Sequence, residues 1–333
     1  MPDYPAVRLH VVTGKGGTGK TTVAAALALA LAGGGRKVLL TEVEGRQGVA
    51  QLFDTAPLPY EERRVAVAPG GGEVFALAID PEQALLDYLH MFYRLSPTGI
   101  PARTLRRMGA MEFATTIAPG LRDVLLTGKV KEAVVRLSQP KGKKARPAYD
   151  AVVLDAPPTG RIARFLNISH EVGGLARVGP IKNQSDSVMQ VLRSPQTAVH
   201  MVTLLEEMPV QETLDAVEEL TSLDLPVGGV VVNMVRAPAL PPADLAAALA
   251  GGLDRAALAG ELAAAGLSAP TALVDALAGE AADHAARVAL EERGRDTLAE
   301  LARPSYELPL LADAVDLGGL YELARMLCEQ GMA

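Results

Sequence analysis

Short apolar runs alternate along this chain with longer segments rich in alanine and leucine, and most of the runs stop at a polar or glycine-bearing stretch. The runs are typical of strands buried in a parallel sheet, and the segments between them, beginning with 22–32, predict helices. The predicted strands are 7–12, 37–43, 74–79, 149–154, 198–205, 227–232 and 305–310. This alternation predicts an α/β fold built on a doubly wound, mostly parallel sheet.

Some stretches hold more helix than a crossover between parallel strands requires. Residues 82–137 and 166–195 predict a helical subdomain inserted between strands, and residues 238–302 predict two or three helices outside the sheet. We expect these parts to belong to one domain spanning residues 1–333. The first stretch carries methionine and aromatic side chains that either fill an ordinary core or line an adaptable apolar surface for a helical client. These side chains are Met91, Phe92, Tyr93, Met108, Met111 and Phe113.

The first predicted strand leads into a glycine-rich loop and then into a helix. The loop reads G-K-G-G-T-G-K-T over residues 14–21, which fits the phosphate-binding pattern G-x-x-x-x-G-K-[ST]. Its glycines let backbone N–H groups converge on phosphate oxygens, and the helix start adds a positive dipole end. By analogy with such loops, Lys20 contacts the β- and γ-phosphates and the Thr21 hydroxyl ligates Mg²⁺. The predicted loop contacts are Gly14, Gly16, Gly17, Thr18, Gly19, Lys20, Thr21 and Thr22.

A second lysine stands inside the loop, directly after its first glycine. Lys15 is either an ordinary solvated lysine or the signature lysine of the deviant phosphate-loop ATPases. In that class the lysine reaches into the nucleotide site of the partner subunit, so that two nucleotides face each other across a dimer. The full match to the deviant pattern K-G-G-T-G-K-T favours the signature role and therefore predicts a dimer.

Carboxylates follow two of the predicted strands at the sheet edge where open α/β folds bind their ligands. Asp155 takes the Walker B position, near Mg²⁺ or its waters. Glu44 is suited to orient a water against the γ-phosphate, and Glu42, on the same face of its strand, is the alternative. The predicted catalytic residues are Lys15, Lys20, Glu44 and Asp155, and the predicted metal ligands are Thr21 and Asp155.

Composition narrows the class of protein without changing the predicted fold. Of the 333 residues, 49% are hydrophobic and 4% aromatic, so alanine, leucine and valine carry the apolar volume. The net charge of −7 argues against a nucleic-acid partner, which would need a basic face. Cys328 is the single cysteine, which excludes a disulfide framework and a Cys₄ zinc site within one chain. The short polar N-terminus and the lack of an apolar run of about 18 residues predict a cytoplasmic protein.

Five segments together resemble one family of ATPases. The chain is similar, nearly end to end, to the arsenical-pump ATPase ArsA and to the ATPase that targets tail-anchored membrane proteins, and it looks closest to an actinobacterial branch. The stretch D-A-P-P-T-G-R, from Asp155 to Arg161, resembles the family's switch II, D-T-A-P-T-G-H. The lysine-bearing loop is less specific, since ParA, MinD and the nitrogenase iron protein share it. The five segments are 14–22, 78–81, 119–123, 155–166 and 230–233.

The resemblance implies a dimeric, Mg²⁺-dependent ATPase that couples ATP binding and hydrolysis to the opening and closing of a helical client site. By position it implies contacts to the adenosine from Asn233, from Glu212 across the dimer, and from the Leu308 and Pro309 stretch. An asparagine at this strand end is equally ordinary in a turn. The implied partner is a second copy or a paralogous ATPase. The implied client is a hydrophobic helix or a membrane protein, with any membrane contact made through a partner.

Three departures from the family pattern limit what the resemblance implies. Where the family reads D-P-A-H at switch I, this chain has Glu44-Gly45-Arg46-Gln47, and the glutamate is one methylene longer. The zinc-binding C-x-x-C and the arsenite-sensing cysteines are absent, so neither zinc nor an arsenite response is expected. The altered switch I leaves a second function open, a nucleotide-binding scaffold or chaperone subunit with weak or no hydrolysis. A third, a MinD- or ParA-type positioning ATPase, is opposed by the acidic charge and the non-basic C-terminal helix.

Overall fold

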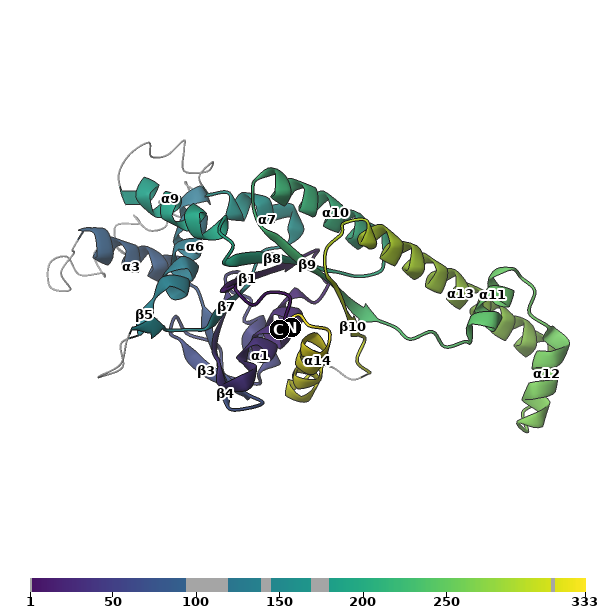
Figure 1. Cartoon of the computed structure of the whole chain (residues 1–333). Helices are drawn as coiled ribbons and strands as arrows, with labels where there is room; N and C mark the ends of the chain where they lie inside the picture. Colours follow the sequence, from purple (N-terminus) through teal and green to yellow (C-terminus); the bar gives the residue numbers. More distant parts are fainter. Residues whose placement is uncertain (1, 94–118, 139–144, 169–179, 313–314) are drawn as a thin grey trace.

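An eight-stranded sheet forms the centre of the computed structural model, which describes the chain except residues 1, 94–118, 139–144, 169–179 and 313–314 (Figure 1). The strand order is β10-β9-β8-β1-β7-β2-β4-β3, with β1 central and strands added on both sides of it. All neighbours are parallel except β3 and β4, which pair antiparallel at one edge. The predicted doubly wound, mostly parallel sheet is therefore confirmed. Its strands are β1 (Leu9–Gly14), β2 (Lys37–Glu42), β3 (Arg63–Ala68), β4 (Gly72–Ala78), β7 (Ala151–Asp155), β8 (Thr197–Thr203), β9 (Val227–Val235) and β10 (Ser305–Pro309).

Helices cover both faces of this sheet, as buried parallel strands require. One face carries α1 (Lys20–Ala32), the short α2 (Gly48–Leu52) and α14 (Leu317–Glu329). The other face carries α6 (Pro119–Val135), α7 (Thr159–Leu166), α9 (Pro180–Leu192) and α10 (Glu207–Ser222). The remaining short elements are a 3₁₀ turn (Gly33–Gly35) and the two-stranded ladder of β5 (Leu137–Ser138) and β6 (Arg146–Pro147).

Successive side chains along each strand point to opposite faces of the sheet, so the hydrophobic core forms two layers, one on each face. In β1, Leu9 and Val11 pack with the α6, α7 and α10 side, whereas Val12 packs with α1 and α14. Helix α1 is buried along its whole length from Val23 to Ala32, because α14 covers the side that the sheet does not. A helix made of alanine and leucine, with no polar face, suits this position between two layers.

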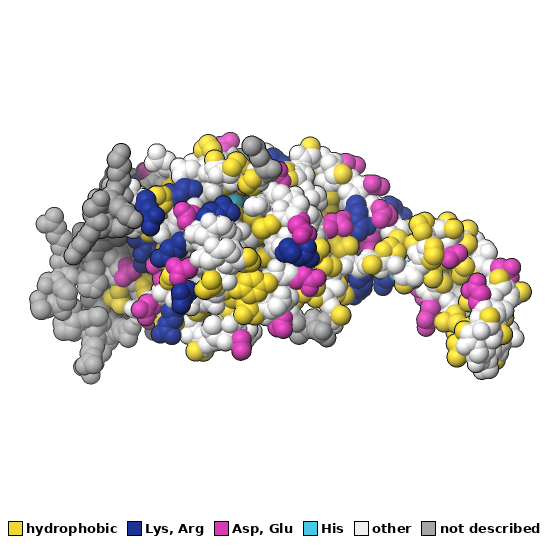
Figure 2. All heavy atoms as spheres, turned by 60° about the horizontal axis from the view of Figure 1, so that its bottom comes forward, with side chains coloured by type: hydrophobic (Ala, Val, Ile, Leu, Met, Phe, Trp, Pro, Cys, Tyr) yellow, Lys and Arg dark blue, Asp and Glu magenta, His cyan; other side chains and the backbone are white. Residues whose placement is uncertain are grey.

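The segment between β9 and β10 forms three helices, α11 (Pro242–Leu249), α12 (Arg255–Ala264) and α13 (Thr271–Ala299). Helix α13 packs on α10 near its C-terminal end and extends away from the sheet, where it carries α11 and α12 (Figure 1). Apolar side chains gather on this protruding part (Figure 2). In the sequence of this segment, Leu249 and Leu267 are exposed. In the parts of the chain that the structure describes, no helix combines the length and apolarity that crossing a bilayer would need.

The predicted helical subdomain lies only partly within the described residues. Helix α3 (Pro81–Tyr93) packs against α6, and α6 packs against α9, so these three helices meet at one end of the sheet (Figure 1). Met108, Met111 and Phe113, part of the possible client surface, lie outside the described residues. Both the subdomain and its client surface therefore stay predictions.

Two histidines from neighbouring strands meet in the core, although their spacing in the sequence gives no such signal. His10 on β1 and His200 on β8 are both fully buried, and His10 Nδ1 lies 3.0 Å from His200 Nε2. The Gly229 N–H donates to His200 Nδ1 at 3.2 Å, so His200 carries its proton on Nε2 and donates to His10. Burial lowers the pKa of His10 to about 4 and that of His200 well below its ordinary value. Both rings are therefore neutral at physiological pH.

We expect these histidines to make the protein less stable as the pH falls from about 6.5 to 4. The unfolded chain takes up protons in this window while the folded chain does not, and the His10 share is about 3 kcal/mol at pH 4. Asp155, whose raised pKa acts with the opposite sign in the same window, partly masks the effect. The measurement is urea unfolding at a series of pH values, comparing the wild type with His10→Gln.

The difference in the free energy of unfolding between the wild type and His10→Gln should shrink as the pH is lowered. His284→Gln is the comparison variant, because this half-buried histidine of α13 contacts Ala239 and Arg287 rather than the His10–His200 pair. A His10→Gln protein that follows the wild-type curve in parallel would show that the histidine pair does not titrate with unfolding.

Candidate functional site

The glycine loop connects the end of β1 to the start of α1 and is shaped by close backbone contacts. Gly19 has φ +82°, and a Cβ there would lie 2.4 Å from the Asn233 amide nitrogen. A Cβ on Gly14 would lie 2.1 Å from the Val202 carbonyl oxygen. Only glycine therefore fits at these two positions. No side chain caps the N-terminus of α1, so its first N–H groups face the loop.

Inside the loop, one backbone carbonyl oxygen accepts hydrogen bonds from two side chains. The Lys15 carbonyl oxygen accepts from Lys20 Nζ at 3.2 Å and from Thr18 Oγ1 at 2.9 Å. Partial burial lowers the pKa of Lys20, and the nearby Asp155 carboxylate acts in the opposite direction. Lys20 is thus folded back over the loop, close to the space that the loop encloses.

The end of β7 brings Asp155 against the loop. Thr21 Oγ1 donates to Asp155 Oδ2 at 2.8 Å, joining two predicted metal ligands that are 134 positions apart. Burial raises the pKa of Asp155 to about 6, which the Thr21 hydrogen bond opposes. A second link ties the same two segments, since Thr13 Oγ1 donates to the Pro157 carbonyl oxygen at 2.7 Å. The loop after Asp155 is therefore attached directly to the phosphate-binding loop.

This donor set fits Mg²⁺, which prefers oxygen ligands. A hydroxyl and a buried carboxylate lie side by side, as in sites where the nucleotide phosphates and waters complete the coordination. Within the ranges described above, no three His, Cys, Asp or Glu side chains gather into a metal-binding group. A nucleotide-bound Mg²⁺ does not need such a group, because it uses one or two carboxylates.

Lys15 forms an ion pair within its own chain. Its Nζ lies 2.8 Å from Glu212 Oε1 on α10, and both side chains are about one-third exposed. The second oxygen of Glu212 accepts from Thr159 Oγ1, at the first residue of α7, at 3.0 Å. The hydrogen bond from Lys15 lowers the pKa of Glu212. This cluster links the loop, the helix that follows Asp155, and α10.

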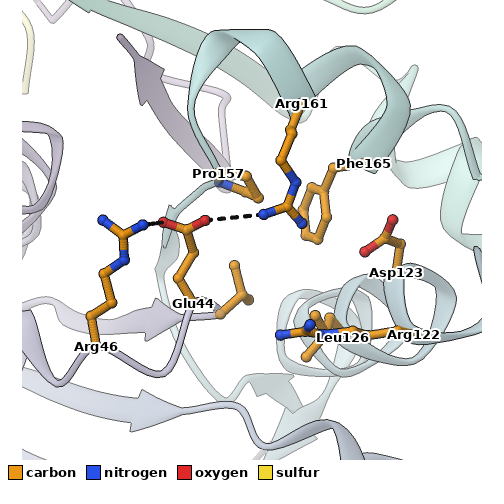
Figure 3. Close-up of a pocket in the computed structure, with 9 residues that line it drawn as sticks. Glu44, Arg46, Arg122, Asp123, Leu126, Pro157, Arg161 and Phe165 are labelled. Carbon is orange, nitrogen blue, oxygen red and sulfur yellow. Dashed lines mark hydrogen bonds and ion pairs between the residues drawn. The ribbon is translucent and has the colours of Figure 1, made fainter. Parts of the chain in front are cut away.

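Glu44 lies between two arginines, Arg46 and Arg161 (Figure 3). Its carboxylate oxygens lie 3.3 Å from Arg161 Nη1 on α7 and 3.7 Å from Arg46 Nη2 in its own loop. These groups border a cavity of about 240 Å³, which α6 closes with Arg122 and Leu126 (Figure 3). Glu44 and Arg161, two of the positions at which switch I and switch II differ from the family pattern, are therefore in direct contact.

The predicted adenine contacts are only partly brought to the loop. Asn233 is buried, and its amide nitrogen donates to the Thr18 carbonyl oxygen at 2.9 Å, so it supports the loop from the side of β9. Leu308 is wholly buried in the core, whereas Pro309 and Thr22 are half-buried. Their role toward a nucleotide, like that of Glu212 across a dimer, stays a prediction.

Sequence reasoning missed the arginine partners of Glu44. Arg46 and Arg161 follow two different strands, and each belongs to a different motif, switch I or switch II. The available signal was the opposite charge of residues in two loops at the same sheet edge. That signal does not say which charges meet, because the loop conformations decide the contact.

Comparison with known proteins gives consistent results. The model of the anion-transporting ATPase family, ArsA_ATPase, matches residues 7–194. The chain is 57% identical over 326 residues to ATPase BagA of Mycobacterium tuberculosis, covering 98% of this chain and 94% of that protein. It is 27% identical over 255 residues to ATPase GET3 of Kluyveromyces lactis, covering 67% of this chain and 71% of the relative. It is 28% identical over 239 residues to the arsenical pump-driving ATPase of Acidiphilium multivorum, covering 67% of this chain and 38% of that protein.

Proposed function

Because this chain belongs to the anion-transporting ATPase (ArsA) family and is an ATP hydrolase, we propose that it works as a Mg²⁺-dependent dimer whose nucleotide state opens and closes a helical client site. The family resemblance found in the motifs is confirmed by these comparisons. The observation that carries the proposal is the contact of Thr21 with Asp155, which joins the phosphate-binding loop to the segment leading into α7. Through this contact, loss of the γ-phosphate would change the position of α7, which packs on the sheet.

In this proposal the loop residues bind the phosphates, one carboxylate helps to hold Mg²⁺, and another positions the attacking water. Lys20 exchanges the Lys15 carbonyl for phosphate oxygens, and Thr21 and Asp155 hold Mg²⁺. When bound, Mg²⁺ neutralises charge on the β- and γ-phosphates. Glu44 positions the attacking water and accepts its proton, which requires the carboxylate to turn from Arg161 toward the phosphate.

The dimer follows from Lys15. A lysine that reaches into the partner subunit's site first has to leave Glu212, its partner within the chain. Since Glu212 also accepts from Thr159 at the start of α7, releasing Lys15 changes the contacts of that helix too. Assembly of the dimer and movement of α7 are thereby coupled through one carboxylate. The partner is a second copy or a paralogous ATPase.

The client site is proposed at the end of the sheet where α3, α6 and α9 meet. Relatives of this chain include a protein named ATPase GET3 and one named arsenical pump-driving ATPase. For this chain we propose a hydrophobic helix or a membrane protein as the client, with membrane contact made only through it. Helix α6 lines the Glu44 cavity and also contacts α3 and α9, so it connects the nucleotide side to that end.

Replacing Lys15 by alanine is expected to weaken the nucleotide-dependent dimer by about 2–5 kcal/mol, because an interfacial charge loses its partner. Binding of nucleotide to the single chain should persist, since Lys20 and Thr21 remain. The measurement is analytical ultracentrifugation with a non-hydrolysable ATP analogue, with the chain alone and mixed with a paralogous subunit. Lys182→Ala, which removes a lysine of α9 that pairs with Asp186, is the matched control and should dimerise like the wild type. Unchanged dimerisation of Lys15→Ala would remove the cross-dimer role.

The test of the whole proposal is the rate of ATP hydrolysis together with capture of a client. Steady-state turnover should require Mg²⁺ and should rise when a helical client binds. The pairing of Glu44 with two arginines favours slow basal turnover, which adds to the altered switch I in support of the scaffold alternative. Tight ATP binding with no turnover, alone or with a paralogue, would favour that scaffold and overturn the coupling of hydrolysis to a client.

A further inference from the structure

We propose that Glu42 is a second carboxylate of the Mg²⁺ site, holding water ligands of the bound metal beside Asp155. The inference rests on the proposed function, because it concerns the metal of the same nucleotide site. Glu42 is the last residue of β2, and the strand register pairs it with Asp155, the last residue of β7. Paired residues of neighbouring parallel strands point to the same face, so the two carboxylates emerge together at the ligand-binding edge.

The two oxygens of Glu42 have different surroundings. Oε1 accepts from the Gly48 N–H, at the start of α2, at 3.1 Å. Oε2 is buried and has no hydrogen-bond partner among the described residues, although the residue as a whole is only 3% exposed. A buried carboxylate oxygen without a partner costs free energy, so structures keep one where a ligand supplies the missing donor.

The Glu42 carboxylate lies in the same region as the Thr21 hydroxyl. A Cβ built on Gly48 would lie 3.8 Å from Thr21 Oγ1 and 3.9 Å from Glu42 Oε1, so both groups border the space beside this glycine. Thr21 in turn donates to Asp155, so the same hydroxyl contacts the other carboxylate of the proposed site. Mg²⁺ keeps several of its waters when it binds a nucleotide, and carboxylates around it accept from those waters.

Glu42 and Glu44 therefore have different roles, Glu42 beside the metal and Glu44 at the attacking water. Glu42 is buried, fixed by α2 and adjacent to the metal side of the loop. The Glu44 side chain is 20% exposed and paired with arginines, which suits a group that moves. The competing explanation for Glu42 is structural, because a carboxylate at the start of α2 also caps that helix. The N–H groups of Arg46, Gln47 and Val49 also lie near the carboxylate, but in the described part of the chain only Gly48 bonds to it, at Oε1, and Oε2 keeps no bonded donor. A glutamine retains the capping oxygen and removes the charge, so it distinguishes the two roles.

The test measures how strongly Mg²⁺ tightens nucleotide binding. The dissociation constant of a fluorescent ADP analogue is determined in Mg²⁺ and in EDTA, and the ratio reports the coupling between metal and nucleotide. Glu42→Gln keeps an oxygen that caps α2 but removes the charge, and we expect the ratio to fall about tenfold while the value in EDTA stays unchanged. Asp150→Asn is the matched control, since Asp150 accepts the Lys37 N–H at 2.8 Å at the opposite end of the same two strands.

Thermal unfolding followed by circular dichroism shows whether each variant folds. If Glu42→Gln does not fold, Glu42→Asp keeps the charge on a side chain one methylene shorter, and a reduced ratio in that variant supports the proposal. An unchanged ratio in a folded Glu42→Gln or Glu42→Asp protein means that Glu42 only caps α2 and overturns the proposal. A wild type that shows Mg²⁺ coupling but never hydrolyses ATP would overturn the proposed function and leave this inference standing.

Discussion

Replacing Lys20 by alanine is expected to lower ATP turnover by about 10²–10³-fold, the usual cost of removing one group that stabilises transition-state charge. The structure gives the physical reason. Lys20 Nζ is partly buried over the loop, 3.2 Å from a backbone carbonyl that a phosphate oxygen would replace. Loss of the ammonium removes a charge-assisted contact that strengthens as charge develops on the β- and γ-phosphates. Both kcat and the affinity for ATP should fall, as measured by phosphate release and by titration of a fluorescent nucleotide.

Lys182→Ala is the matched control for this experiment. That lysine lies on α9 and its ammonium pairs with Asp186 at 2.5 Å on the surface, remote from the loop. Its replacement should leave steady-state turnover within twofold of the wild type. If Lys20→Ala and the wild type hydrolyse ATP at the same rate, hydrolysis does not take place at this loop and the assignment of the site is wrong.

Sequence patterns sufficed where the structure is local or periodic. Glycines at 14 and 19 are required by the close approach of the Val202 carbonyl and of the Asn233 side chain, and the loop pattern predicts both. The buried strands also followed from their continuous apolar runs, because a parallel sheet covered on both faces leaves no polar side. The approach of Asp155 to Thr21 was predictable for the same reason, since the ends of parallel strands share one edge.

The remaining contacts depend on side chains that are distant in sequence and on loop conformation. Glu44 and Arg161 are 117 positions apart, and His10 and His200 are 190 apart, so neither pair leaves a pattern in the chain. The protruding helices α11 and α12 illustrate a different limit. Their alanine-rich sequences show little contrast between faces, so the pattern predicts helix but not whether the helix packs on the sheet or extends from it.

Replacing Glu44 by glutamine is expected to lower kcat by about 10²–10⁴-fold, the range for losing a general base, while nucleotide affinity changes little. Glutamine keeps the length of the side chain and still accepts a hydrogen bond from Arg161, but it cannot take a proton from water. The split between kcat and KM is the informative measurement, because a structural defect in the loop would change both. The control is Glu61→Gln, which replaces an exposed glutamate in the segment before β3. This variant should turn over ATP like the wild type.

The contact between Glu44 and Arg161 makes this experiment decisive for the altered switch I. If the carboxylate takes part in hydrolysis, it has to leave a guanidinium at 3.3 Å, and the free energy of an exposed ion pair, about 0–1 kcal/mol, is small enough to permit that. Arg161→Gln then leaves most of the turnover intact, whereas Glu44→Gln does not. Equal losses in both variants would mean that Arg161 acts on the phosphates itself, and wild-type turnover in Glu44→Gln would exclude Glu44 as the base.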